Sequence, residues 1–235
     1  MFYGTRSPRQ DNGLRGLFIT GTDTDVGKTY VTSLIARQFV AQGVRVGVYK
    51  PVASGCRPAE DTLLSDDAVA LWQAAGKPES LDHVCPQRFQ APLVPHLAAE
   101  AEGKQVDEKQ FQLGFDWWKD RADVLLVEGA GGLLCPLTSG KFYVADLAAQ
   151  FALPLVVVAA NRLGVLNHTL LTVSVAQARG LPVAAVVLNH VRPSSVDQST
   201  HTNASELRRR LELPVLELGW NEPQTKPPQN WLSLC

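Results

Sequence analysis

The chain has 235 residues, of which 45% are hydrophobic and 19% are charged, and this is enough to bury one substantial core. A net charge of −1 argues against a nucleic-acid-binding surface and against a polybasic membrane anchor. The four cysteines are scattered, without a C-x-x-C pair, which indicates a reduced, cytoplasmic protein.

Short apolar segments alternate with amphipathic segments along the chain. The apolar segments predict six strands, at 17–20, 44–49, 123–127, 154–159, 183–188 and 214–218. The amphipathic segments predict seven helices, at 28–42, 66–75, 97–102, 107–120, 143–152, 167–179 and 203–212. This alternation predicts an α/β fold with a doubly wound, mostly parallel sheet and helices on both faces. Ligands of such folds bind beyond the carboxyl ends of the strands.

These elements are expected to form one domain at residues 17–219. The polar segment 1–16 has no apolar core and is expected to be a flexible extension rather than a secretory signal. Residues 220–235 are proline-rich and are expected to form an irregular tail. The most apolar run, 151–160, is far shorter than the roughly 20 residues that a membrane span needs.

The segment GTDTDVGKT, residues 21–29, joins the first predicted strand to the first predicted helix. Backbone N–H groups of such a loop bind phosphate, and Gly27 allows the backbone to approach closely. Lys28 can reach the β and γ phosphates, and the Thr29 hydroxyl can ligate Mg²⁺. Five residues, rather than the usual four, separate Gly21 from Gly27. The strand before the loop and the G-K-T at the helix start nevertheless favour a nucleotide-binding P-loop over an ordinary glycine turn.

A P-loop also needs carboxylates that hold Mg²⁺ on the nucleotide. Glu128 ends a predicted apolar strand and is followed by the glycine-rich segment 129–132, against which a substrate or phosphate could lie. A second candidate is the pair Asp66 and Asp67, after the predicted helix N-cap Ser65. Carboxylates in a first helical turn also favour the helix dipole without any metal, so both interpretations of this pair stay open.

Lys50 ends the second predicted strand, and Pro51 keeps the chain extended there. Because the carboxyl ends of parallel strands share one edge of the sheet, its ammonium would face the phosphate loop. Ser54 and Gly55 follow as candidate anion contacts. A solvated lysine at a strand end is an equally good interpretation from position alone.

Seven motifs together resemble the dethiobiotin synthetase family of ATP-dependent carboxylases. They are G-T-D-T-D-V-G-K-T (21–29), Y-K-P-V-A-S-G (49–55), S-D-D-A-V-A-L (65–71), P-L-V-P-H (92–96), V-E-G-A-G-G (127–132), L-G-V-L-N-H (163–168) and V-L-N-H-V (187–191). They follow the family's order and cover roughly residues 17 to 191. The first motif also occurs in related cobyrinic-acid amidases. The segments K-P-V-A-S-G and L-G-x-x-N-H favour the dethiobiotin synthetase family over these relatives.

The resemblance implies a reaction and its cosubstrates. It implies an ATP- and Mg²⁺-dependent ligase that joins carbon dioxide to 7,8-diaminononanoate (7,8-diaminopelargonate) and releases ADP and phosphate. One amine forms a carbamate, ATP phosphorylates the carbamate to a carbamic–phosphoric anhydride, and the other amine closes the cyclic urea of dethiobiotin. It also implies a homodimer with the substrate site at the interface.

The resemblance further implies roles for individual residues. Catalytic roles fall to Lys28, Lys50 and Ser54, and metal ligation falls to Thr29, Asp67 and Glu128. Nucleotide contacts fall to Thr24, Asp25, Val26, Gly27, Lys28, Thr29, Tyr30 and Asn189. Substrate contacts fall to Ser54, Glu128, Gly131 and Gly132 and, from the partner subunit, to Gly164, Val165, Leu166 and Asn167. Asn167 is equally well placed to be the N-cap of the helix that follows it.

Two positions depart from the family pattern. Ala91 replaces an acidic residue that often precedes P-x-x-P-H, which puts in doubt a hydrogen bond made there. Gly219 and Trp220 stand where the family often has a G-x-I-P-like segment that shapes the base pocket. The sequence therefore leaves the nucleotide base preference open.

Two other functions use a related phosphate loop. A glutamine-dependent amidase needs a glutaminase domain with a nucleophilic cysteine, for which this chain has no room. A partitioning or scaffold ATPase, in which nucleotide binding switches dimerisation, usually carries a lysine early in the loop. Here that part of the loop reads Thr22, Asp23 and Thr24. Dependence of ATP turnover on a small diamine would separate the ligase from the switch ATPase.

Overall fold

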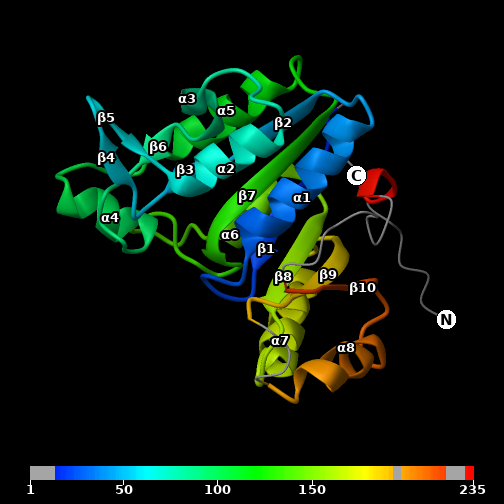
Figure 1. The fold of residues 1–235 in the computed structure, drawn as a ribbon. Coiled ribbons are helices and arrows are strands. Elements are labelled where there is room, and N and C mark those ends of the chain that lie inside the picture. Colours follow the sequence, from blue (N-terminus) through cyan, green and yellow to red (C-terminus); the bar gives the residue numbers. More distant parts are fainter. Residues whose placement is uncertain (1–13, 193–196, 221–230) are drawn as a thin grey trace.

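The computed structural model describes residues 14–192, 197–220 and 231–235 (Figure 1). Its central sheet has six strands: β1 (Arg15–Gly21), β2 (Val46–Tyr49), β7 (Val124–Gly132), β8 (Leu155–Ala160), β9 (Val183–Asn189) and β10 (Val215–Leu218). Their order is β10-β9-β8-β1-β7-β2, and every pairing is parallel. The predicted α/β fold is confirmed, and all six predicted strands are present.

The seven predicted helices are also present. They are α1 (Lys28–Ala41), α2 (Asp66–Ala74), α4 (Pro95–Ala101), α5 (Glu108–Trp118), α6 (Val144–Phe151), α7 (Val165–Ala178) and α8 (Thr200–Arg208). Helices α1 and α2 pack against each other near β1, β7 and β2 (Figure 1). Helices α5 and α6 join through stacked Phe115 and Phe151, whose ring centroids are 4.3 Å apart. Helices α7 and α8 cover the half of the sheet formed by β8, β9 and β10.

Several short elements were not predicted from the sequence. Between β2 and α4 the chain forms β3 (Val52–Ala53), β4 (Arg57–Ala59), β5 (Thr62–Leu64), α3 (Leu81–Val84) and β6 (Gln87–Arg88). The pair β3–β6 is parallel, and β4–β5 is an antiparallel hairpin. Elements of two to four residues are too short for a helical or strand period to appear in the sequence.

The valine-rich strands are covered on both faces. In β8, Val156 and Val158 belong to the main core, whereas Val157 and Ala159 belong to a second cluster with residues of α7 and α8. Burial on both faces explains why this strand reads as a continuous apolar run rather than an alternating one.

The register of the sheet brings two predicted site residues together. Tyr49 pairs with Val127, so Lys50, the first residue after β2, lies beside Glu128, in the middle of β7. Strand β7 continues to Gly132, beyond the predicted end at residue 127. On its other side Glu128 pairs with Ile19, after which the register of β1 and β7 shifts. The candidate site therefore begins where regular strand pairing ends.

The ends of the described chain approach the core. Strand β1 begins at Arg15, inside the predicted extension. The predictions for residues 1–13 and 221–230 concern positions outside the described residues. Trp231 is buried in the main core, with Leu234 and Cys235 packed against it. Across the parts of the chain that the structure describes, no helix is both long and apolar enough to cross a membrane.

Candidate active site

The phosphate loop connects β1 to α1 through two left-handed backbone conformations. Asp25 has a φ of 56°, and Gly27, the N-cap of α1, has a φ of 90°. Aspartate is one of the few side chains that adopts this region readily. At position 27 only glycine fits, because a Cβ would lie 2.1 Å from Nδ2 of Asn189. Loops of this kind form a backbone concavity that binds anions.

Lys28 lies over this loop. Its Nζ donates a hydrogen bond to the carbonyl oxygen of Asp23 at 3.0 Å, and the side chain is largely buried. Burial lowers the pKa of Lys28, and the neighbouring charge of Lys50 acts in the same direction. The negative charge of Glu128 offsets part of this effect.

Glu128 forms the centre of the site and is fully buried. Its Oε1 accepts hydrogen bonds from the Thr29 hydroxyl at 2.8 Å and from Nζ of Lys50 at 2.7 Å. Its Oε2 accepts a hydrogen bond from the Thr32 hydroxyl at 3.1 Å. A buried carboxylate is tolerated only when it is paired and hydrogen-bonded, and here both oxygens have partners.

Lys50 joins Glu128 to Asp67. Its Nζ lies 2.7 Å from Oε1 of Glu128 and 2.8 Å from Oδ2 of Asp67. Burial lowers the pKa of Lys50, but the two carboxylates outweigh burial and the net pKa is raised. For Asp67, burial raises the pKa, but the charge of Lys50 and the hydrogen bonds from Lys50 and Thr29 together outweigh burial, and the net pKa is lowered. Both groups are therefore held in their charged forms.

The two candidate aspartates both lie in the first turn of α2 but point to different partners. Ser65 is its N-cap, as predicted, and accepts a hydrogen bond from the backbone N–H of Ala68 at 3.2 Å. This start directs Asp67 to Lys50, whereas Asp66 pairs with Arg57 at the surface, at 2.9 Å. The structure thus brings Asp67, and not Asp66, to the centre.

A cleft of about 940 Å³ lies beside these charges. Ten of the predicted site residues line it: Thr24, Asp25, Gly27, Lys28, Thr29, Lys50, Ser54, Gly55, Asp67 and Gly131. Most of its apolar lining comes from the segment 92–97, which contributes Pro92, Leu93, Val94, Pro95 and Leu97 and is called the apolar wall. Leu93 and Leu97 are 48% and 44% exposed, so this wall offers uncovered hydrocarbon surface. The cleft therefore combines a charged end with an apolar side.

Five predicted residues near the loop do not line the cleft: Val26, Tyr30, Glu128, Gly132 and Asn189. Asn189 instead braces the phosphate loop, because its Nδ2 donates to the carbonyl oxygen of Val26 at 3.0 Å. Its Oδ1 is buried and has no hydrogen-bond partner within the described residues. Tyr30 is 38% exposed and lies on the outside of the site.

The segment Gly164, Val165, Leu166 and Asn167 also lies outside the cleft, at the start of α7. The alternative that Asn167 is the N-cap is wrong. Gly164 is the N-cap, with a φ of 94°, and the backbone N–H of Val165 already bonds to the carbonyl oxygen of Arg162 at 3.1 Å. The helix therefore begins two residues earlier than predicted, and Asn167 is exposed in its first turn.

Sequence reasoning missed three contributions to the site. Thr32 lies one turn after Lys28 and Thr29 on α1, so helical spacing could have identified it. Cys135 lines the cleft beside Gly131 but lies in an irregular segment after β7, where no periodic signal exists. The apolar wall at 92–97 is brought to the cleft by tertiary packing alone.

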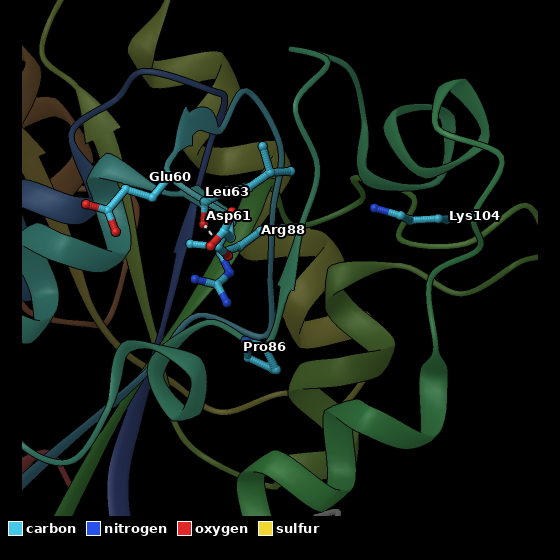
Figure 2. A pocket seen from close by; sticks show the side chains of 7 residues that line it. Glu60, Asp61, Leu63, Pro86, Arg88 and Lys104 are labelled. Atoms are coloured by element: carbon cyan, nitrogen blue, oxygen red, sulfur yellow. Dashed lines mark hydrogen bonds between the residues drawn. The ribbon is translucent and has the colours of Figure 1, made fainter.

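A second hollow, of about 470 Å³, shares no lining residue with this cleft. It lies between the β4–β5 turn, with Glu60 and Asp61, and the side chains of Arg88 and Lys104 (Figure 2). Both cations already have acidic partners: Arg88 pairs with Asp82, and Lys104 lies 2.8 Å from Glu102. Among the described residues, therefore, neither cation that lines the hollow is unpaired.

Comparison with known proteins decides the family. A family model described as an AAA domain matches residues 15–227. The ATP-dependent dethiobiotin synthetase BioD of Rhodopirellula baltica is 45% identical over 210 residues, which is 85% of this chain and 81% of that protein. The chain belongs to the ATP-dependent dethiobiotin synthetase family. It is therefore an ATP-dependent ligase, and the switch-ATPase alternative has less support.

Other members of the dethiobiotin synthetase family agree. The protein of Anaeromyxobacter dehalogenans (strain 2CP-C) is 44% identical over 208 residues, covering 88% of this chain and 91% of its own. That of Thermodesulfovibrio yellowstonii is 36% identical over 207 residues, covering 86% of each chain.

Solved structures resemble the chain in fold alone. The hydrogenase maturation factor HypB of Archaeoglobus fulgidus superposes with a TM-score of 0.51 at 15% identity, covering 88% of this chain and 82% of that one. The cell division protein FtsY of Thermotoga maritima gives 0.53 at 13% identity, covering 99% and 70%.

Proposed function

We propose that this chain joins carbon dioxide to 7,8-diaminononanoate and closes the cyclic urea of dethiobiotin, through a carbamate and a carbamic–phosphoric anhydride. The observation that carries the proposal is the charged centre in the P-loop cleft, in which the buried Lys50 bridges the buried Glu128 and the half-exposed Asp67. Family membership supplies the identity of the substrates and of the products, dethiobiotin, ADP and phosphate.

Two lysines are placed to neutralise a transferring phosphoryl group. Lys28 begins α1 at the phosphate loop, Lys50 directly follows β2, and both side chains line the cleft. Fixed positive charge in a site screened from water stabilises phosphoryl transfer without reorganisation. Ser54 lines the same cleft and is proposed to contact the carbamate or the phosphate.

The oxygen donors at the centre fit a magnesium ion. Thr29, Asp67 and Glu128 converge around Lys50, and hydroxyl and carboxylate oxygens are the ligands that Mg²⁺ prefers. We assign Mg²⁺ binding to these three side chains. When bound, the ion neutralises charge on the nucleotide phosphates. No Cys or His is required, in keeping with a hard cation.

The cleft suits an amphipathic, chain-like substrate. Its charged end holds Lys50 and Ser54 for the carbamate and its phosphate, and its apolar wall at 92–97 offers hydrocarbon contact for the aliphatic chain. Gly131 lines the cleft and Gly132 lies close to the phosphate loop, so their backbone can approach the substrate. Glu128 is fully buried, so it would act on the substrate only through Thr29 and Lys50, which contact its carboxylate.

The far carboxylate of the substrate is assigned to a second copy of the chain. Gly164, Val165, Leu166 and Asn167 lie outside their own cleft, at the N-terminus of a 14-residue helix, where backbone N–H groups favour anions. A homodimer would carry them to the partner's cleft. This assignment rests on the family resemblance.

The nucleotide is assigned to the phosphate loop, with Thr24, Asp25, Gly27 and Thr29 lining the cleft. Val26 and Tyr30 stay assigned through the motif, and the unpartnered Oδ1 of Asn189 supports a contact to the base.

All four cysteines are free thiols, which supports a reducing, cytoplasmic location.

Mass analysis of the product tests the proposal. The protein is incubated with ATP, Mg²⁺, ¹³C-bicarbonate and 7,8-diaminononanoate, with 8-aminononanoate as the matched control that lacks one amine. With the diamine we expect dethiobiotin that carries one ¹³C atom from bicarbonate. With 8-aminononanoate we expect no cyclic product, because ring closure needs the second amine. Unlabelled diamine recovered beside free phosphate would overturn the proposal.

A further inference from the structure

The orientation of the Glu128 carboxylate is fixed by a residue that no motif marks. Its Oε1 meets Thr29 and Lys50, whereas its Oε2 meets only the hydroxyl of Thr32, at 3.1 Å, within the described chain. Thr32 is fully buried, so no water reaches this contact from the surface. The carboxylate is thus held from both sides by side chains of α1.

The Thr32 hydroxyl has one proton and two candidate acceptors. It lies 2.8 Å from the carbonyl oxygen of Lys28 and 3.1 Å from Oε2 of Glu128. The Lys28 carbonyl already accepts the helical N–H four residues later, so it is satisfied without the hydroxyl. Oε2 has no other donor within the described residues, and hydrogen bonds to ionised groups are the stronger ones. The proton therefore belongs on the bond to Glu128.

We propose that Thr32 is a positioning residue that holds the Glu128 carboxylate so that Oε1 faces Thr29 and Lys50. This inference rests on the proposed function, which assigns Glu128 to the metal. A carboxylate left without its Oε2 partner is free to rotate, and its oxygen is then no longer kept in place for the ion. Outer partners of metal ligands tune metal affinity in this manner.

Three variants separate the hydroxyl from its packing. Thr32→Val keeps the shape and removes the donor, whereas Thr32→Ser keeps the donor and removes the methyl group. Thr169→Val is the matched control, because the Thr169 hydroxyl is equally buried in α7 and has no hydrogen-bond partner. Each variant is first compared with the unmodified protein by thermal unfolding, and Thr32→Ala replaces Thr32→Val if the latter does not fold.

The readout is the binding of Mn²⁺, as a probe for Mg²⁺, to the protein saturated with a non-hydrolysable ATP analogue. We expect Thr32→Val to weaken Mn²⁺ binding about tenfold or more, the usual effect of losing an outer partner. Binding of the analogue in EDTA should change less than about twofold, because Thr32 does not line the cleft. Thr32→Ser and Thr169→Val should bind Mn²⁺ like the unmodified protein.

Unchanged Mn²⁺ affinity in Thr32→Val would overturn the proposal. Equal weakening in Thr32→Ser or in Thr169→Val would also overturn it, since packing rather than the hydroxyl would then be responsible. Metal binding does not need the diamine, so this result is independent of whether the protein makes dethiobiotin.

Discussion

Two polar clusters lie at the carboxyl edge of the sheet, and they differ in charge. Beside β2 and β7, the cluster consists of ionised groups, with the buried Lys50 between the buried Glu128 and the half-exposed Asp67. Beside β8 and β9, the amide cluster consists of two buried asparagine side chains and the ring of His190. There Nδ2 of Asn161 forms a hydrogen bond with His190 at 2.9 Å, and Oδ1 of Asn161 accepts one from Asn203 at 2.8 Å.

The ionised cluster is placed to act on a ligand, whereas the amide cluster is placed to hold the backbone. The ionised cluster opens on the cleft through Lys50 and Asp67, so its charges can act on a ligand. The amide cluster is satisfied internally and holds the segment before α7: Asn203 lies 3.4 Å from the carbonyl oxygen of Arg162, and Asp197 accepts from the N–H of Leu163 at 2.8 Å. We therefore expect a polar cluster to act on a ligand where its groups face a cavity, and to be structural where its groups face each other.

Removing the cation from the ionised cluster has the largest expected effect. We expect Lys50→Met to lower phosphate release at least about 10²-fold, because a charge aimed at the transferring group is lost. It also leaves Glu128 buried without its cation, which destabilises the fold by about 3–5 kcal/mol. Phosphate release and urea unfolding measure the two effects.

The double variant Lys50→Met with Glu128→Gln is the control for this loss. It removes the unpaired charge, so it should recover most of the stability and none of the activity. Recovery of both would mean that the cluster only holds the fold together.

Asn161→Ala should show the opposite pattern. It leaves Nδ2 of Asn203 without its 2.8 Å acceptor, which we expect to lower the free energy of unfolding by about 1–3 kcal/mol. The phosphate rate of the folded fraction at saturating substrates should stay within about threefold, since Asn161 does not line the cleft. A loss of rate without a loss of stability would contradict the structural role of the amide cluster.

Asn167→Ala tests the loop that the amide cluster supports. Because Asn167 is exposed, stability should not change, whereas the KM for the diamine should rise about tenfold through loss of a carboxylate contact. The KM for ATP serves as the internal reference and should stay constant. An unchanged diamine KM would remove this loop from the substrate site.

The smallest effect concerns acid stability at Asp197. Hydrogen bonds from the side chain of Ser199 and from the backbone of Leu163 lower the pKa of Asp197. Because the folded pKa lies below the unfolded one, this stabilisation is present above about pH 4 and is lost as the pH falls through the folded pKa. The variant Asp197→Asn should therefore lose less stability than the unmodified protein between pH 6 and pH 3. Equal losses in urea unfolding would contradict this.

The parts of the site that follow from strand order were predictable. Lys50 and Glu128 each follow a predicted apolar strand, and parallel strands end at one edge, so their meeting needed no knowledge of side-chain packing. That β7 continues past Glu128 to Gly132 was not predicted. The apolar wall at 92–97 was not predictable, because it comes from an irregular segment that only tertiary contacts bring to the cleft. Asn167 was a plausible N-cap by residue type, but the left-handed Gly164 starts the helix earlier.

The most direct test of the account is phosphate release from ATP and Mg²⁺ with labelled bicarbonate, measured with and without 7,8-diaminononanoate. The account predicts that release depends on the diamine and that one label enters an acid-stable product for each phosphate. Release at the same rate without the diamine, with no label fixed, would contradict it and point to a nucleotide switch.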